Sequence, residues 1–199
     1  MSERKIMVLD TIKQFKWFDL FILILLFRIC YVALKTGFPT EVFKLLGTIF
    51  ATLLSLHYYT IISDFLNARF SITAVPLEFM DFIIFAILAE MGYFTFSMLR
   101  FAFLRVVKVE AISLLNRWGG LAVGLMRAGL LIGLLTYGAT ISSVKYLKSS
   151  VENSYFGKYT FEISPSLYRN FWDGFISKFL PDSKANKIVE ETINNFGRK

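Results

Sequence analysis

The chain has very few of the residues from which catalytic and metal sites are usually built. Among its 199 residues, Cys30 is the only cysteine and His57 is the only histidine. These counts exclude an internal disulfide, a zinc site built from cysteines or paired histidines, and a Ser/His triad of any complexity. The sequence also contains no P-loop and no G-x-S-x-G motif.

An intramembrane aspartyl site would need two facing aspartates. Asp19 and Asp81 are the available candidates, but both lie near the ends of apolar segments and lack the flanking glycine pattern of such enzymes. We therefore expect no catalytic residues, no metal and no cofactor. The sequence predicts that the protein is not an enzyme.

Charged residues are also scarce, at 19% of the chain against about 25% in a typical soluble domain. The 22 Lys and Arg residues exceed the 15 Asp and Glu residues and give a net charge of +7. No compact basic cluster appears, so we expect contact with anionic lipid headgroups and no nucleic-acid partner.

Hydrophobic residues are abundant, at 55% of the chain, and they are concentrated in four runs. A helix needs roughly 20 apolar residues to cross the hydrocarbon layer. The sequence predicts an all-α integral membrane bundle with four spans, and a more polar tail over residues 145–199 follows the membrane domain at 1–144. The expected spans are residues 18–34, 45–63, 77–99 and 118–141. Arg28 interrupts the first run, which favours a retained helix over a cleaved signal peptide.

Three connecting or terminal segments carry local signals. Residues 36–41 predict a tight turn that makes a hairpin of the first two helices. Residues 100–117 predict an amphipathic interfacial helix, or a continuation of the third helix out of the membrane. In the tail, Ser164 and Pro165 predict the N-cap and first position of an amphipathic helix over 165–180 that ends at Pro181. Its aromatic stripe fits either the headgroup region or packing on the protein's own loops. The stripe consists of Leu167, Tyr168, Phe171, Trp172, Phe175, Ile176 and Phe179.

Small residues at helical spacing predict where membrane helices approach closely. The fourth span carries them on two faces, so we expect it near the centre of the bundle. The stripes are Gly47, Ala51 and Ser55 in the second span, Gly120, Gly124 and Ala128 in the fourth, and Gly129, Gly133 and Ala122 on the opposite face of the fourth.

Three charged residues, Arg28, Glu90 and Arg127, lie near the middle of their spans. Each costs roughly 2.5–3.5 kcal/mol there, so each must face protein or water. Arg127 falls on the same helical face as Gly120 and Gly124. Glu90 is the natural partner for Arg127 or Arg28, as a pair that fixes helix register; the alternative is that the three line a path for ions, protons or an anionic substrate. His57 is expected as an interfacial anchor.

Three motifs in order resemble the colicin V production protein family. Trp17-Phe18-Asp19 before an apolar run is similar to the family's opening. Residues 37–47 (GFPTEVFKLLG) resemble its G-F-x-x-E-x-x-x-L-x-G turn, and residues 116–129 (NRWGGLAVGLMRAG) resemble its D-R-x-x-G-x-x-x-G-x-x-R-G helix entry. Asn116 and Ala128 depart from the usual Asp and Gly, and Ala33 replaces a Gly.

The resemblance implies a four-helix protein of the bacterial inner membrane that supports toxin production or export and envelope homeostasis. Its expected partners are the lipid bilayer and other membrane proteins or a second copy of itself. Lys and Arg flank the spans equally on both sides, so the positive-inside rule does not orient the chain; relatives that fuse a periplasmic protease favour an outward tail. The matching positions are Asp19, Gly37, Glu41, Gly47, Arg117, Gly120, Gly124 and Arg127.

Overall fold

The computed structural model describes residues 16–70, 75–106, 113–179 and 185–196, and this part of the chain contains helices and no strands. Four long helices are apolar enough to cross a membrane: α2 (Trp17–Thr36), α3 (Phe38–Phe70), α4 (Leu77–Val106) and α5 (Ser113–Ile141). The prediction of four helices long and apolar enough to cross a membrane is thereby confirmed. Shorter helices follow: α6 (Lys145–Glu152), α7 (Tyr155–Thr160), α8 (Ile163–Phe171), a π-helical turn η1 (Trp172–Ile176), α9 (Ser177–Phe179) and α10 (Lys187–Asn195).

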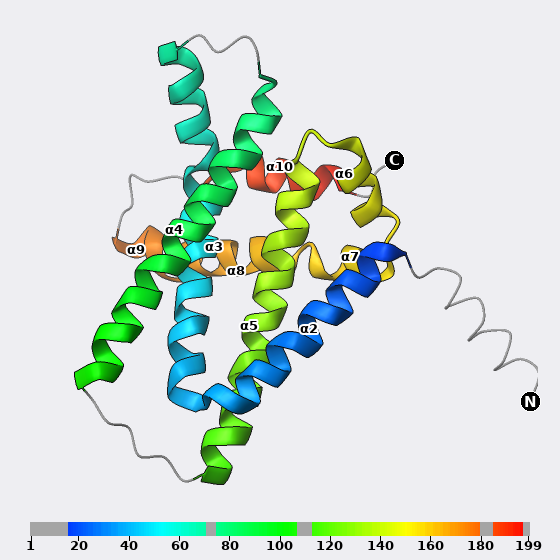
Figure 1. The fold of residues 1–199 in the computed structure, drawn as a ribbon. Helices are drawn as coiled ribbons and strands as arrows, with labels where there is room; N and C mark the ends of the chain where they lie inside the picture. Colours follow the sequence, from blue (N-terminus) through cyan, green and yellow to red (C-terminus); the bar gives the residue numbers. More distant parts are fainter. Residues whose placement is uncertain (1–15, 71–74, 107–112, 180–184, 197–199) are drawn as a thin grey trace, which may run out of the picture.

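Helices α2 and α3 do not form the expected hairpin. They meet at Gly37 and then diverge, so that α2 packs on α5 while α3 packs on α4 and α5 (Figure 1). Gly37 is the single residue between the two helices and has a φ of +82°, a conformation that favours glycine. The sequence located this turn correctly, but a turn residue does not determine the angle at which the next helix leaves.

Helix α5 lies at the centre of the bundle, as expected. It contacts α2, α3 and α4 and also three helices of the tail. Half of its most apolar stretch is buried, a larger share than in any of the other three spans.

The segment after the third span continues α4 as far as Val106. Residues 107–112 lie outside the described part of the chain, and α5 begins at Ser113. The described portion of 100–117 therefore belongs to the two long helices, and no separate interfacial helix is present in it.

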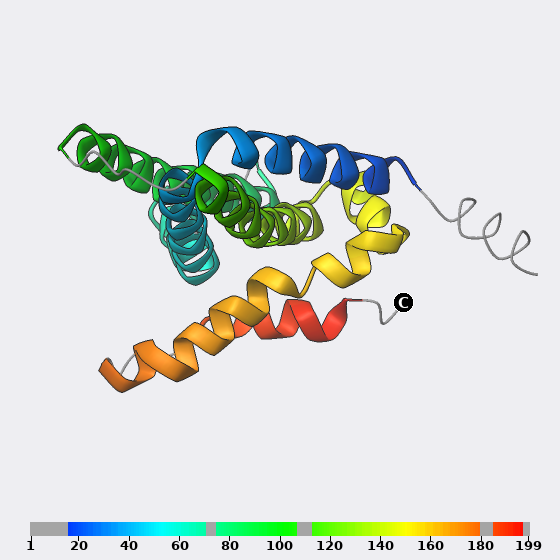
Figure 2. The same ribbon diagram turned by 90° about the horizontal axis from the view of Figure 1, so that it is seen from below.

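The tail forms a layer along one side of the bundle, with α8, η1 and α9 running as one helical rod (Figure 2). The rod begins at Ile163, so Ser164 lies inside the first turn and is not the N-cap that was predicted. Instead, the Ser164 hydroxyl donates to the Leu130 carbonyl in α5 at 2.9 Å. The aromatic stripe divides between two surroundings: Trp172 is buried against the bundle, whereas Phe179 is 70% exposed. Pro181 lies outside the described residues.

Candidate functional site

A cluster of buried charges lies where α2, α3 and α5 meet, beside the Gly37 turn. The Glu41 carboxylate at its centre is completely buried. One oxygen, Oε1, accepts from the Thr36 hydroxyl and from the Lys44 ammonium, both at 2.6 Å. The other oxygen, Oε2, lies 3.0 Å from Nε of Arg127 in α5. One carboxylate is thus shared by groups from all three helices.

The sequence builds this cluster from the turn outward. Gly37 is the single residue between α2 and α3, so Glu41 falls in the first turn of α3. The positive end of the helix favours an anion there. Asn116 of α5 supports the same helix end, since its Oδ1 accepts from the Phe38 backbone N–H at 2.7 Å. Asn116 therefore performs a capping role that an Asp at this position could also perform.

Two glycines let α5 approach the turn. A Cβ on Gly120 would lie 3.0 Å from the Ala33 carbonyl oxygen and 3.1 Å from the Phe38 nitrogen. A Cβ on Gly124 would overlap the Cβ of Ala33. A Cβ on Gly124 would force α2 and α5 apart, and one on Gly120 would be tighter than almost all real Cβ contacts, so the close approach that brings Arg127 to Glu41 relies on these two glycines.

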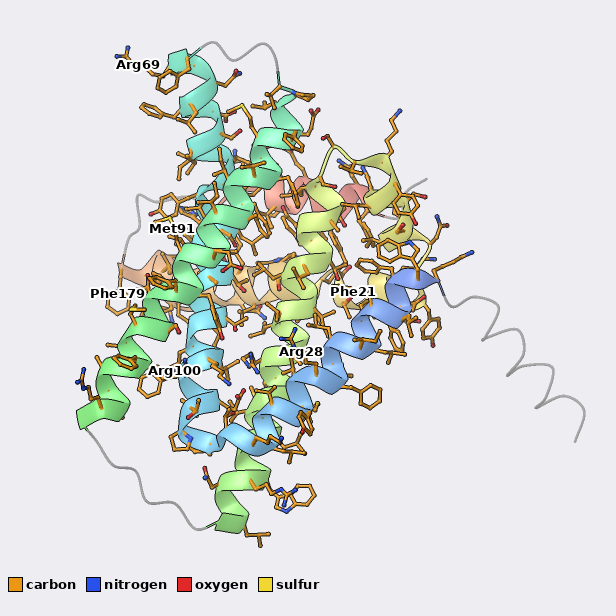
Figure 3. The ribbon with its side chains drawn as sticks, viewed as in Figure 1. Phe21, Arg28, Arg69, Met91, Arg100 and Phe179 are labelled. Atoms are coloured by element: carbon orange, nitrogen blue, oxygen red, sulfur yellow. The ribbon has the colours of Figure 1, made fainter. Side chains whose placement is uncertain are left out.

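The prediction that Glu90 is the partner of Arg127 is wrong. Arg127 does project into the packed face, as its spacing from the two glycines indicated, but its ionic partner is Glu41. The Glu90 and Arg28 side chains are exposed on α4 and α2, and neither has an ion-pair partner within the described ranges. Figure 3 shows Arg28 on α2 and shows Met91, the neighbour of Glu90, on α4 at the other side of the bundle. The three predicted charges therefore do not meet.

A second buried carboxylate, Asp19, connects the membrane bundle to the tail. Its side chain accepts from the backbone N–H of Lys16 at 2.9 Å, which closes the first turn of α2. It also accepts from the Ser154 hydroxyl at 2.6 Å and from the backbone N–H groups of Tyr155 and Phe156 at 3.2 and 2.8 Å. One carboxylate thus caps the N-termini of both α2 and α7.

The small-residue stripes behave differently from one another. Gly47 and Ala51 face α4, and Ser55 is buried further along the same helix, as predicted. Their closest counterpart is Gly92 of α4, which was not predicted; a Cβ there would lie 2.7 Å from Cα of Ala51. Gly92 has no small residue four positions away in either direction, so the spacing rule does not identify it.

The opposite face of α5 does not form the second small-residue stripe that was expected. Gly133 packs tightly, since a Cβ there would lie 2.9 Å from the Ser164 hydroxyl. Ala128, which belongs to the first stripe, is fully buried. Gly129 has no neighbour within 4 Å of a Cβ, and Ala122 is exposed. Here the contact of α5 is with the tail and not with another span.

His57 lies on α3 against the tail rod. Its ring stacks on Trp172 with centroids 4.6 Å apart, and its Nδ1 is 2.9 Å from the Tyr168 hydroxyl. That hydroxyl also accepts from the Asn186 backbone N–H at 2.9 Å. Burial raises the pKa of the Tyr168 hydroxyl. This hydroxyl therefore links His57 of α3 to the Asn186 backbone at the start of α10.

These arrangements define the chain as an all-helical, multi-pass membrane protein whose buried carboxylates connect helices. Among the described residues, no group of three His, Cys, Asp or Glu side chains could hold a metal ion. The chain belongs to the colicin V production protein family, whose model matches residues 18–165. No curated protein and no solved structure matches the chain at a significant level.

Most residues of the family pattern have defined places in the structure. Gly37 forms the turn, Glu41 and Arg127 form the ion pair, and Asp19 joins α2 to α7. Arg117 differs from these, because its side chain is exposed at the start of α5. The pattern thus corresponds chiefly to the contacts that hold α2, α3, α5 and the tail together.

Proposed function

We propose that this protein is a non-enzymatic component of the bacterial inner membrane that supports toxin production or export and envelope homeostasis. In this proposal it acts by assembling with another membrane protein through the outer face of α4. The membership of the colicin V production protein family supports the process. The exposed Glu90 supports the mode of action.

Helix α4 has the least buried apolar stretch of the four spans. Its outward side chains form a continuous apolar stripe with one carboxylate, Glu90, in the middle. The stripe consists of Ile83, Ile87, Met91, Phe94 and Met98, each between 41% and 60% exposed. A partner helix can pack against such a stripe.

The Glu90 carboxylate is unfavourable if this stripe faces lipid without a partner helix. An ionisable group that faces lipid costs roughly 2.5–3.5 kcal/mol at the centre of a span and less toward its ends, and pairing with another helix removes part of that cost. We therefore expect the partner helix to carry a Lys, Arg or side-chain amide at the depth of Glu90. In this assembly the partner helix covers the apolar side chains of the stripe and pairs with Glu90.

Cross-linking from α4 tests this assembly. Met91→Cys in a Cys30→Ser background should give specific adducts in native membranes with a thiol-reactive photo-cross-linker. Glu90→Gln should reduce these adducts, whereas Glu78→Gln, in the first turn of α4, should not. Adducts that are absent, or that are insensitive to Glu90→Gln, contradict the proposed assembly.

The process and the location are tested separately. Cells lacking the protein should secrete less of a small peptide toxin and grow poorly under detergent stress, and wild-type protein should restore both. Density-gradient fractionation should place the protein with inner-membrane markers. Normal secretion and normal growth without the protein would refute the proposed process even if α4 has a partner.

A transport pathway lined by Arg28, Glu90 and Arg127 receives no support from the geometry. The first two side chains are exposed on different helices, and the third is paired with Glu41. Purified protein in liposomes should therefore move no protons, ions or amphiphiles. Flux above that of empty liposomes would restore the transport hypothesis.

A further inference from the structure

A cavity of about 520 Å³ lies between α3 and the tail rod. Its wall on the bundle side is formed by apolar side chains of α3, such as Ile49 and Leu53, and its wall on the tail side by Trp172 and Ile176. The cavity is open, and exposed side chains of Leu46 on α3 and Phe171 on the tail lie at its edge. Its volume lies within the ~300–1,000 Å³ range of small-molecule sites.

The position of this groove along the bundle can be estimated from α3. At 1.5 Å per residue, the 19 steps from Phe38 to His57 cover roughly 29 Å. That distance is close to the ~30 Å thickness of the hydrocarbon layer. With the polar turn at Gly37 placed at one surface of the hydrocarbon layer, His57 and the tail rod lie at the other surface.

The residues beyond this level agree with that placement. Helix α3 continues to Phe70 and α4 begins at Leu77, and both extend past the other helices (Figure 1). This extension carries Asp64, Arg69 and Glu78, which suit water or headgroups. The groove below His57 therefore opens sideways into the hydrocarbon of one leaflet.

The surroundings of the groove determine what fills it. Its walls are apolar, so water would find few hydrogen-bond partners there, and an empty groove would lose dispersion contacts on both walls. The groove is continuous with the lipid-facing surface of α3, where Leu46 and Phe50 are 42% and 38% exposed. Its polar groups, those of His57 and the neighbouring Tyr58 and Tyr168, lie at the headgroup end.

We propose that the groove holds one acyl chain of a bilayer phospholipid, with the ester region beside His57. The chain packs between α3 and the tail rod and completes their interface. Tail and bundle are thus joined partly through lipid. This site is distinct from the outer face of α4 and does not depend on the assembly proposed for it.

Trp172 provides a reporter for the occupant, because its side chain lines the groove but is only 6% exposed. In a Trp17→Phe and Trp118→Phe background it is the sole tryptophan. Full-length protein is reconstituted in phosphatidylethanolamine and phosphatidylglycerol vesicles, with or without bromine near the middle of the acyl chains. We expect the brominated chains to remove most of the Trp172 emission.

Two matched substitutions distinguish chains in the groove from chains around the protein. Ile49→Phe fills the groove and should restore much of the emission, whereas Ile24→Phe, on the exposed face of α2, should leave quenching unchanged. Circular dichroism of each variant should match that of the parent. Weak quenching in the parent, or equal quenching in both variants, overturns the proposal. Weak quenching together with a cross-linked dimer across Trp172 would assign the groove to a second copy of the chain.

Discussion

Glu41 of α3 and Arg127 of α5 approach to 3.0 Å between Oε2 and Nε, and both side chains are almost completely removed from solvent. The same carboxylate is bonded by Thr36 at the end of α2. This pair is therefore the point at which three of the four spans are held in register. It also explains why an arginine is tolerated in an otherwise apolar helix.

Replacement of the Glu41 carboxylate should lower the stability of the protein, because Arg127 then has no counter-charge. Glu41→Gln leaves Arg127 buried without a counter-charge, and we expect a loss of about 3–5 kcal/mol in the free energy of unfolding. Chemical denaturation in detergent micelles measures it. The double variant Glu41→Gln with Arg127→Met should recover part of the loss. Glu78→Gln, on an exposed side chain, serves as the control, and a loss of the same size there would contradict the assignment.

Asp19→Asn should loosen the tail while leaving the four spans inserted. The carboxylate accepts four hydrogen bonds, three of them from residues 154–156. An amide has one acceptor oxygen, and hydrogen bonds to a charged group contribute about 1.5–3 kcal/mol. We expect faster hydrogen exchange in α7 and faster proteolysis of the tail.

Ser154→Ala removes one of the donors to Asp19 and should produce a smaller change of the same kind. Ser177→Ala, whose hydroxyl donates to the Asp173 carbonyl in the tail rod, should leave α7 unchanged. Unaltered exchange in α7 after Asp19→Asn would show that the carboxylate does not secure the tail.

Two glycines of α5 should respond oppositely to the same substitution. Gly124→Ala places a methyl group against Ala33, and overpacking of this kind typically costs about 1–3 kcal/mol. Gly129→Ala meets no atom within 4 Å and removes an unfavourable helix residue, a gain of up to about 1 kcal/mol. Thermal unfolding in one detergent compares the two directly. Equal shifts in the same direction would contradict the packing of α5 on α2.

Asn186→Ala should detach α10 from α3. Its side-chain amide donates to the Leu56 carbonyl at 2.9 Å and to the Thr60 hydroxyl at 3.0 Å, while its oxygen caps α10 through the Ile188 N–H. Loss of the cap alone costs about 1 kcal/mol. Hydrogen exchange should rise over 187–195 and stay constant in α5. Asn153→Ala, whose amide donates to Ser149 within α6, should leave α10 protected.

The four apolar helices and the packed face of Gly120 and Gly124 could be predicted from the sequence, because both depend on local composition and helical spacing. Arg127 was placed correctly on the face of Gly124 for this reason. Its partner could not be predicted, since a helical wheel gives the face of a residue but not the helix that covers it. Glu41 was expected as a position of the family pattern, whereas its contact with α5 depends on the way α2 and α3 diverge. Gly92 was missed because its partner, Ala51, is visible only in three dimensions.

The bonds made by Asp19 also impose an order on the assembly of the protein. The ribosome completes α2 long before it reaches Ser154, so the carboxylate enters the membrane region without three of its four donors. Until α7 is made, Asp19 must be hydrated or protonated, and the N-terminal end of α2 is free to move. Docking of the tail onto α2 can therefore occur only after α7 is made, and a chain interrupted before Ser154 would leave three of the four bonds to Asp19 unmade.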